Sequence, residues 1–238
     1  MKKAVISSLV FCLFITPLFS EKLDLAIKYL GITAVKVQMV DNGKQITTHA
    51  RATGLASIVA QLDNYYITEY EGNYLPTSYK KIIAQKDYLE DRITFYDREN
   101  FVAVRNDNIL HEKFDYKIHQ DSRDFFAALY QLRFIPELDS GYLWLDANKL
   151  IWRAKYKLIK KESIKTVLGK KDALVIELDF EKISTSNKEN TDMLTNNLVD
   201  EDKNLIFWIS DDDKRIPLKA KFTMKPFAVS WELLKYEE

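Results

Sequence analysis

Alternation of apolar and polar residues at every second position is the feature of this sequence that most constrains its fold. The segments Leu150–Leu158, Leu174–Phe180, Leu218–Met224 and Phe227–Leu233 carry apolar side chains at one set of alternate positions and mostly polar or charged ones between them. Successive side chains of a β-strand point to opposite faces, so each segment has one apolar and one wet face. That pattern is typical of antiparallel strands covered on one side.

The clearest turn signal joins two such segments near the start of the chain. Asp41-Asn42-Gly43 separates Val35–Val40 from Lys44–Ala52. Asn-Gly favours positive φ at both central positions of a hairpin turn, so we predict a type I′ turn at Asn42-Gly43.

Helical periodicity is present in only two segments, Gly54–Leu62 and Asp121–Arg133. In the second, Asp121 or Ser122 is a candidate N-cap, and Pro136 follows the end. Its apolar stripe consists of Phe125, Phe126, Leu129 and Leu132. The stripe must be buried, and the covered face of the sheet is available. We therefore predict a mainly β (β-rich α+β) fold: a large curved antiparallel sheet, or open or half barrel, with one or two short helices packed on its concave face.

The first twenty residues predict a signal peptide. Lys2 and Lys3 precede an apolar run from Ala4 to Leu18, and the small Ser20 suits a cleavage site. Cys12 lies inside that run behind a bulky residue, so the pattern is not that of a lipoprotein. We expect an exported, periplasmic chain with no transmembrane helix after residue 20; a retained N-terminal anchor is the alternative.

Residues 21–238 contain no Pro/Gly/Ser-rich linker, so they are predicted to form a single β-rich domain. Residues 184–204 are polar and lie between strand patterns, which indicates a mobile insertion. A short helix through Met193–Leu198 fits the apolar residues inside it.

No motif for catalysis, metal or cofactor binding is found. Lys plus Arg and Asp plus Glu number 35 each, so bulk charge does not favour a nucleic-acid partner. His49, His111 and His119 match no metal-ligand spacing, and no serine lies in a nucleophile motif. Asp211–Asp213 lacks the calcium-loop spacing and is interpreted as a solvated turn. We predict no catalytic residue, no metal and no cofactor.

The apolar surface carries the functional hypothesis. Two short helices leave part of a large sheet to be closed by loops or by a ligand. We predict a cleft for an acyl chain or similar hydrophobe, lined by Phe125, Leu129, Trp152 and Tyr156. The alternatives are docking of an envelope protein partner, a hydrolase-type enzyme whose site is not visible in the sequence, and a structural assembly factor without a pocket. Trp208 and Trp231 are expected to be buried against the helix.

Several short motifs, in this order, resemble a family of bacterial exported proteins known as domain of unknown function 3108. They include Tyr29-Leu30-Gly31-Ile32, Thr53-Gly54-Leu55, Leu168–Ala173 and Trp208–Leu218. The resemblance implies a β-rich protein of the periplasm or facing the outer membrane, similar to open-barrel lipoprotein carriers. It implies no catalytic residues.

Overall fold

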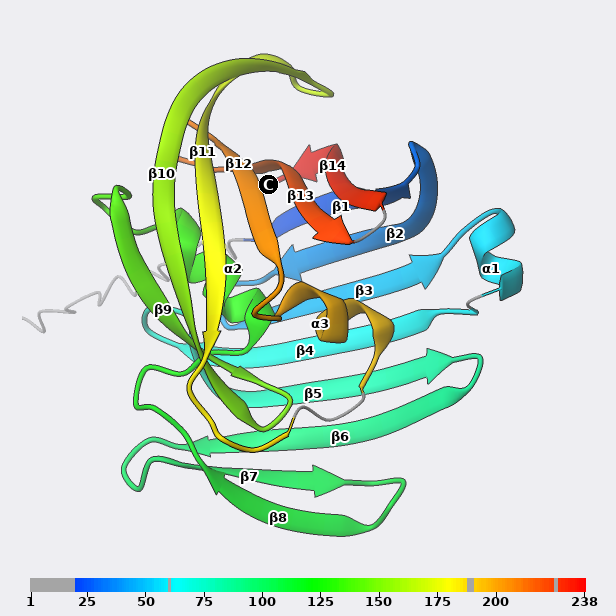
Figure 1. The fold of residues 1–238 in the computed structure, drawn as a ribbon, viewed down its shortest axis with the longest axis vertical. Helices are drawn as coiled ribbons and strands as arrows, with labels where there is room; N and C mark the ends of the chain where they lie inside the picture. The colour runs from blue at the N-terminus through cyan, green and yellow to red at the C-terminus, as the bar shows by residue number, and fades with distance from the viewer. Residues whose placement is uncertain (1–19, 60, 188–190, 225–226) are drawn as a thin grey trace, which may run out of the picture.

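The computed structural model describes residues 20–59, 61–187, 191–224 and 227–238 (Figure 1). A single sheet of fourteen strands dominates it, and every neighbouring pair of strands is antiparallel. The first eight strands are β1 (Glu21–Tyr29), β2 (Ile32–Asp41), β3 (Gln45–Ala52), β4 (Asp63–Glu71), β5 (Leu75–Gln85), β6 (Tyr88–Asp97), β7 (Val102–Asp107) and β8 (Glu112–Lys117). The remaining six are β9 (Ser140–Ala147), β10 (Leu150–Thr166), β11 (Gly169–Lys182), β12 (Asn204–Ser210), β13 (Pro217–Met224) and β14 (Phe227–Glu237).

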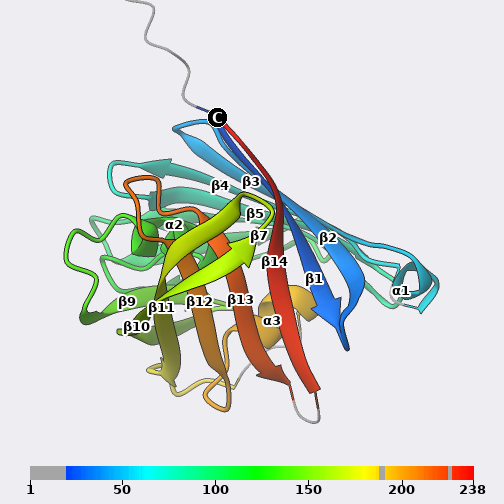
Figure 2. The same ribbon diagram turned by 90° about the horizontal axis from the view of Figure 1, so that it is seen from above.

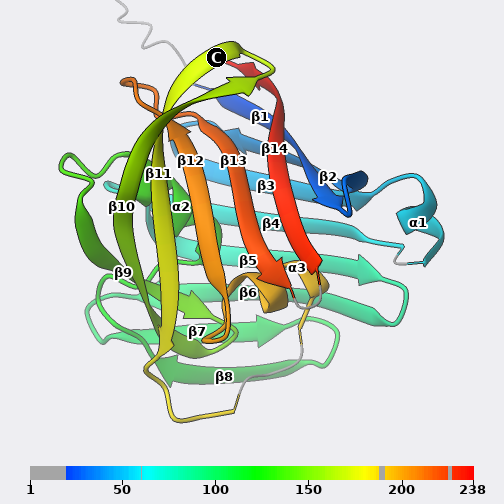
Figure 3. The ribbon, with the colours of Figure 1, turned by 45° about the horizontal axis from the view of Figure 1, so that its top comes forward.

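The sheet consists of two meanders joined by the first and last strands. Its order is β8-β7-β6-β5-β4-β3-β2-β1-β14-β13-β12-β11-β10-β9. Each meander pairs strands that follow one another in sequence, and β1 pairs with β14 to connect the two. The sheet curls strongly, so that β10–β14 pass in front of β3–β6 and the apolar faces meet inside (Figure 3).

The two sheet edges approach each other without closing into a barrel by backbone hydrogen bonds. Edge strands β8 and β9 are the two ends of the strand order. Side chains join the two edge regions instead: the hydroxyls of Tyr96 and Tyr116 donate to the Asp146 carboxylate at 3.2 and 2.6 Å. Burial raises the pKa of Asp146, although Arg105 and the two tyrosines act in the opposite direction. The seam is therefore polar and buried.

Three short helices accompany the sheet, α1 (Leu55–Val59), α2 (Phe125–Arg133) and α3 (Met193–Leu198). Helices α2 and α3 lie inside the curl (Figure 1). The predicted fold class, a curved open antiparallel sheet with one or two helices on its concave face, is confirmed. Helix α1 differs: it extends from the end of the sheet, and none of its residues is buried.

Buried side chains hold both ends of α2. The N-cap is Asp124, whose carboxylate accepts from the backbone N–H groups of Phe126 and Ala127 at 2.9 and 3.2 Å. The predicted caps, Asp121 and Ser122, lie three and two residues before the actual N-cap. At the other end, the Arg133 guanidinium donates to both oxygens of Glu21 on β1 at 2.6 and 2.7 Å. This geometry fixes α2 across the concave face.

The β2–β3 turn is one residue out of the predicted register. Asn42 and Gln45 flank it, joined by a backbone hydrogen bond of 3.1 Å, so its central residues are Gly43 and Lys44. Of these only Gly43 has positive φ, at 83°, which is the type II′ pattern. The predicted type I′ turn at Asn42-Gly43 is wrong.

Residues 1–19 lie outside the described part of the chain, and so does the predicted signal peptide except for Ser20. Within the predicted insertion at 184–204, α3 forms where a short helix was expected, and Leu194, Leu198 and Val199 are buried in the core. Residues 188–190 lie outside the described ranges, and mobility of this segment stays a prediction.

Candidate functional site

The four residues predicted to line a hydrophobic cleft lie in or against the core but border different spaces. Leu129 on α2 borders a small apolar cavity, Phe125 borders a polar one beneath α3, and Tyr156 borders a groove beside β9. Trp152 is buried, and its indole N–H donates to the Ala147 carbonyl at 3.3 Å. The fold does not bring these four side chains together around one cavity, and ligand binding by them stays a prediction.

The apolar cavity between α2 and the sheet measures about 30 Å³. Its walls include Leu23, Met39, Leu129, Phe207 and Trp231. A cavity of that volume has room for only a few water molecules, so an acyl chain does not fit it as it stands. The interior is filled by the protein's own side chains, and most of its apolar residues belong to one continuous cluster.

The two tryptophans expected against α2 face opposite ways. Trp231 is buried beside α2 and meets the Phe207 ring edge-on, with the ring centroids 6.4 Å apart. Trp208 follows Phe207 on β12 and therefore points to the other face. There its indole N–H donates to Glu162 at 2.6 Å. Trp208 is buried, as expected, but on the face opposite α2, because its strand carries buried apolar residues on both faces.

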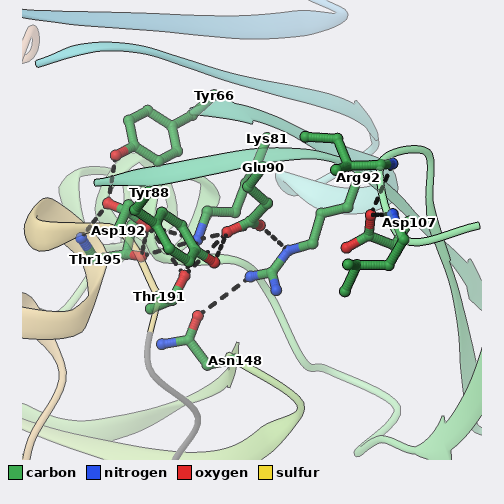
Figure 4. Close-up of polar contacts among 12 residues, drawn as sticks. Tyr66, Lys81, Tyr88, Glu90, Arg92, Asp107, Asn148, Thr191, Asp192 and Thr195 are labelled. Carbon is green, nitrogen blue, oxygen red and sulfur yellow. Dashed lines mark hydrogen bonds and ion pairs between the residues drawn. The ribbon is translucent and has the colours of Figure 1, made fainter. Parts of the chain in front are cut away.

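Beneath α3, four ionic side chains gather in the interior (Figure 4). The Nζ of Lys81, on β5, lies 2.5 Å from the Asp192 carboxylate and 3.7 Å from that of Glu90, on β6. Arg92, two residues further along β6, pairs with Glu90 and also donates to Asn148 at 3.3 Å. All four ionic side chains are buried. We call Lys81, Glu90, Arg92 and Asp192 the buried ionic cluster.

Hydroxyl groups complete the coordination of both carboxylates. Tyr66 on β4 donates to Asp192 at 2.5 Å, and Thr195 on α3 donates to it as well. Tyr88 donates to Glu90 at 2.6 Å. Asp192 also accepts from the backbone N–H of Thr195 at 2.9 Å, which makes it the N-cap of α3. The same carboxylate thus starts the helix and ties it to the sheet.

Electrostatics keep Asp192 ionised. Burial raises its pKa, but attraction to Lys81 and the hydrogen bonds from Lys81, Thr195 and Tyr66 outweigh burial and hold the pKa at about 2. Asp124 at the start of α2 behaves in the opposite way: burial raises its pKa to about 6, against the hydrogen bonds from Ala127, Thr68 and Phe126. A buried carboxylate therefore caps the N-terminus of both α2 and α3.

The buried ionic cluster has the properties of a structural tie. Its two cationic and two anionic groups balance, and the adjoining cavity measures about 20 Å³, which leaves no room for a substrate. Among the described residues, no group of three or more His, Cys, Asp or Glu side chains is placed to hold a metal ion.

Sequence reasoning missed this cluster, although a signal was present. Lys81, Glu90 and Arg92 occupy the core-facing phase of β5 and β6, where alternation leads one to expect apolar residues. Tyr66, Lys81 and Arg92 are direct cross-strand neighbours in one row. Charged residues at inward positions of two adjacent strands indicate a buried polar network.

Outside the core, large apolar side chains are exposed at one end of the first meander. The β1–β2 turn presents Leu30 and Ile32, and α1 presents Leu55, Ile58 and Val59; all five are 61–80% exposed. Tyr29 is exposed beside them. Helix α1 lies against β2 and β3, so the two tips are adjacent (Figure 2). We call Tyr29, Leu30, Ile32, Leu55, Ile58 and Val59 the apolar rim.

The opposite end of the same meander is polar. Turns alternate between the two ends of an antiparallel meander, so the β2–β3, β4–β5 and β6–β7 turns lie away from the apolar rim. Of the large apolar residues in these three turns, Phe101 alone is exposed within the part of the chain that the structure describes. Exposed apolar area is therefore concentrated at one end of the meander.

Comparison with models of protein families assigns the chain to a family. A model described as "Protein of unknown function (DUF3108)" matches residues 25–226. The chain belongs to the DUF3108 family. The resemblance seen in the sequence motifs is confirmed. No curated protein matches the chain.

One solved structure shares the architecture of this DUF3108 member, and a second is similar over most of its length in the alignment. A β-barrel-like protein of the DUF1849 family from Brucella abortus is 11% identical, with a TM-score of 0.58, covering 92% of this chain and 98% of its own. A candidate lipoprotein from Parabacteroides distasonis is 12% identical, with a TM-score of 0.36, covering 92% and 95%. The first of these likenesses shows a shared fold and nothing about function.

Proposed function

We propose that this DUF3108 protein is an exported, non-catalytic protein of the cell envelope that binds a hydrophobic partner at its apolar rim. The observation that carries the proposal is the contrast between a filled interior and a rim of exposed aliphatic side chains. Soluble monomers seldom expose contiguous apolar patches unless these bind something. The n-region, apolar run and Ser20 support export.

The interior favours binding at the surface over an enclosed ligand. Its cavities beside α2 and α3 measure about 30 and 20 Å³. Arg133 with Glu21 and Asp192 with Lys81 tie the two helices down through buried ion pairs. Opening either helix would leave buried charges without partners, which costs about 3–5 kcal/mol per pair.

The ionic groups of the interior also favour a non-catalytic role. An active site needs a titratable group directed at a space where a substrate can sit. Both carboxylates of the buried ionic cluster are already bound by a cation and by hydroxyls. Within the described ranges, no helix is long and apolar enough to cross a membrane.

A fluorescent hydrophobic probe tests this proposal. Wild-type protein should bind the probe saturably, and Leu55→Asp/Ile58→Asp should lose that binding because both side chains lie on exposed α1. The matched control is Val167→Asp, the same kind of change at an exposed valine (58%) in the β10–β11 turn, which should bind as wild type does.

A second variant separates the rim from the interior. Leu129→Ala enlarges the apolar cavity and leaves the rim unchanged, so probe binding at the rim should be unaffected. Binding that increases in Leu129→Ala and persists in the rim variant would place the ligand inside and restore the predicted carrier cleft. Absence of saturable binding by wild-type protein would refute the proposal.

A further inference from the structure

We propose that the partner of the apolar rim is the surface of an anionic lipid bilayer, into which the β1–β2 turn and α1 insert. This inference rests on the proposed function above and names the partner of the same site. It follows from the composition of the two tips, from their shape and from the charges behind them.

Both tips are free of charge over a long stretch. Residues 29–35 read YLGITAV and residues 53–62 read TGLASIVAQL, without a single Asp, Glu, Lys, Arg or His. The chain as a whole is 29% charged, so about five charged residues would be expected among seventeen positions of average composition, and these two stretches contain none. Inserting a charged side chain into hydrocarbon is costly, and these tips would carry none into it.

The shape of the rim favours a bilayer over a folded protein. Leu30 and Ile32 lie at a hairpin turn, and α1 projects beyond the end of the sheet (Figure 1). These side chains protrude. A folded protein partner would need a complementary, well-packed pocket to receive them. A bilayer accepts protruding aliphatic side chains without a preformed pocket.

Basic residues follow directly behind the uncharged tips. Lys36 on β2 and Arg51 on β3 are exposed and lie directly opposite each other across the two strands. Like charges in that position repel, so they weaken the sheet locally. Arg51 also has Asp63 directly opposite it on β4, so Lys36 is the charge that anionic headgroups would chiefly compensate when the tips are inserted.

Two further ionisable side chains beside the tips, Lys28 and Asp63, have close side-chain partners. Lys28 lies 2.5 Å from Glu232, and Asp63 lies 2.6 Å from His49. The β5–β6 and β7–β8 turns at the same end expose Leu89, Ile109 and Leu110. These two turns also carry exposed charges, among them Lys86, Asp87 and Glu112. We therefore confine insertion to the first two tips and expect the others to lie at the headgroup layer.

Vesicle co-sedimentation tests the inference. Protein purified in its exported form is mixed with vesicles of phosphatidylethanolamine and phosphatidylglycerol, or of phosphatidylcholine alone. Wild-type protein should bind the anionic vesicles more tightly, and added salt should reduce the difference. Leu55→Asp/Ile58→Asp should weaken binding at least about a hundredfold, because burying each of the two large aliphatic side chains is worth about a factor of ten or more.

Two controls make the result specific. Val167→Asp should bind vesicles as wild type does. All variants have the same N-terminus, so any contribution of that segment to vesicle binding is the same in each of them. Lys36→Gln/Arg51→Gln should lose the preference for anionic vesicles while keeping binding to phosphatidylcholine. Circular dichroism should show the same strand content in all variants.

Two outcomes would overturn the inference: no sedimentation of wild-type protein with either vesicle, or equal binding by wild type and Leu55→Asp/Ile58→Asp. If vesicles are not bound while the rim variant still loses the hydrophobic probe, the rim binds a protein instead. The proposed function then stands and the bilayer is excluded. If Leu55→Asp/Ile58→Asp binds the hydrophobic probe as wild type does, both the proposed function and the bilayer inference are refuted.

Discussion

Replacing Asp192 by Asn isolates the contribution of the ion pair beneath α3. Asn keeps the size of the side chain and an oxygen that can accept from the Thr195 backbone N–H and from Tyr66. It removes the negative charge that lies 2.5 Å from Lys81. The helix cap is thus preserved while a buried lysine loses its closest counter-ion.

The expected loss in the free energy of unfolding is about 3–5 kcal/mol, the usual cost of breaking one side of a buried pair. The cost of deprotonating Lys81 sets an independent upper limit on this loss of stability. Lys81 can escape the penalty by releasing its proton, and deprotonating an ordinary lysine at pH 7 costs about 5 kcal/mol. Glu90 lies 3.7 Å from Lys81 but is already bound to Arg92, so it offsets only part of the loss.

Urea denaturation followed by tryptophan fluorescence measures the effect, in a double-mutant cycle with Lys81→Met. Each single variant should lose about 3–5 kcal/mol, and Lys81→Met/Asp192→Asn should lose less than either, because no buried charge of this pair is then left alone. Lys160→Met, which breaks the exposed pair with Glu162, should leave the free energy of unfolding close to that of wild type. If the double variant loses the sum of the two single losses, the tie between α3 and the sheet is not electrostatic.

Two further predictions concern stability. The pKa of Asp192 is held at about 2, below its ordinary value of 3.8, so its contribution to stability is complete above about pH 4 and is lost as the pH falls towards 2. Across that window the free energy of unfolding of wild type should fall by about 2 kcal/mol more than that of Asp192→Asn. Parallel pH profiles of the two proteins would contradict this assignment. Trp231→Ala should lower the free energy of unfolding by about 3–5 kcal/mol because the indole is buried beside α2. Tyr142→Ala, at an exposed aromatic residue, should stay within about 0.5 kcal/mol of wild type, and equal losses in the two variants would refute the assigned facing of β14.

The fold class could be predicted because its cause is local. Alternation in Leu150–Leu158 and Leu174–Phe180 reports which face of each strand is buried, whatever strand lies next to it. The Asp121–Arg133 helix has a stripe that fits a sheet face, and it is found there as α2. Pairing of β1 with β14 could not be predicted, since alternation says nothing about which strands are neighbours.

The candidate sites were harder to predict, for two physical reasons. Burial of Lys81 depends on Asp192, which lies 111 residues later (192 − 81) and approaches only in the folded chain. Exposure of Leu55 and Ile58 is equally invisible, since an apolar stripe at helical spacing normally indicates a packed face. Helix α1 breaks that rule, and such departures from local consistency are expected at functional sites.

Pairing of the first strand with the last determines when this sheet can be completed. Lys22 pairs with Glu237, so β1 has only one neighbour until β14 has been synthesised. Contacts so distant in sequence form slowly, because a long loop must close before they yield any stabilisation. A chain that has lost β14 keeps two separate meanders, each with an open edge and an uncovered apolar face. Such a chain is prone to aggregation and proteolysis, so truncation before Phe227 should affect the yield of soluble protein more than loss of any hairpin turn.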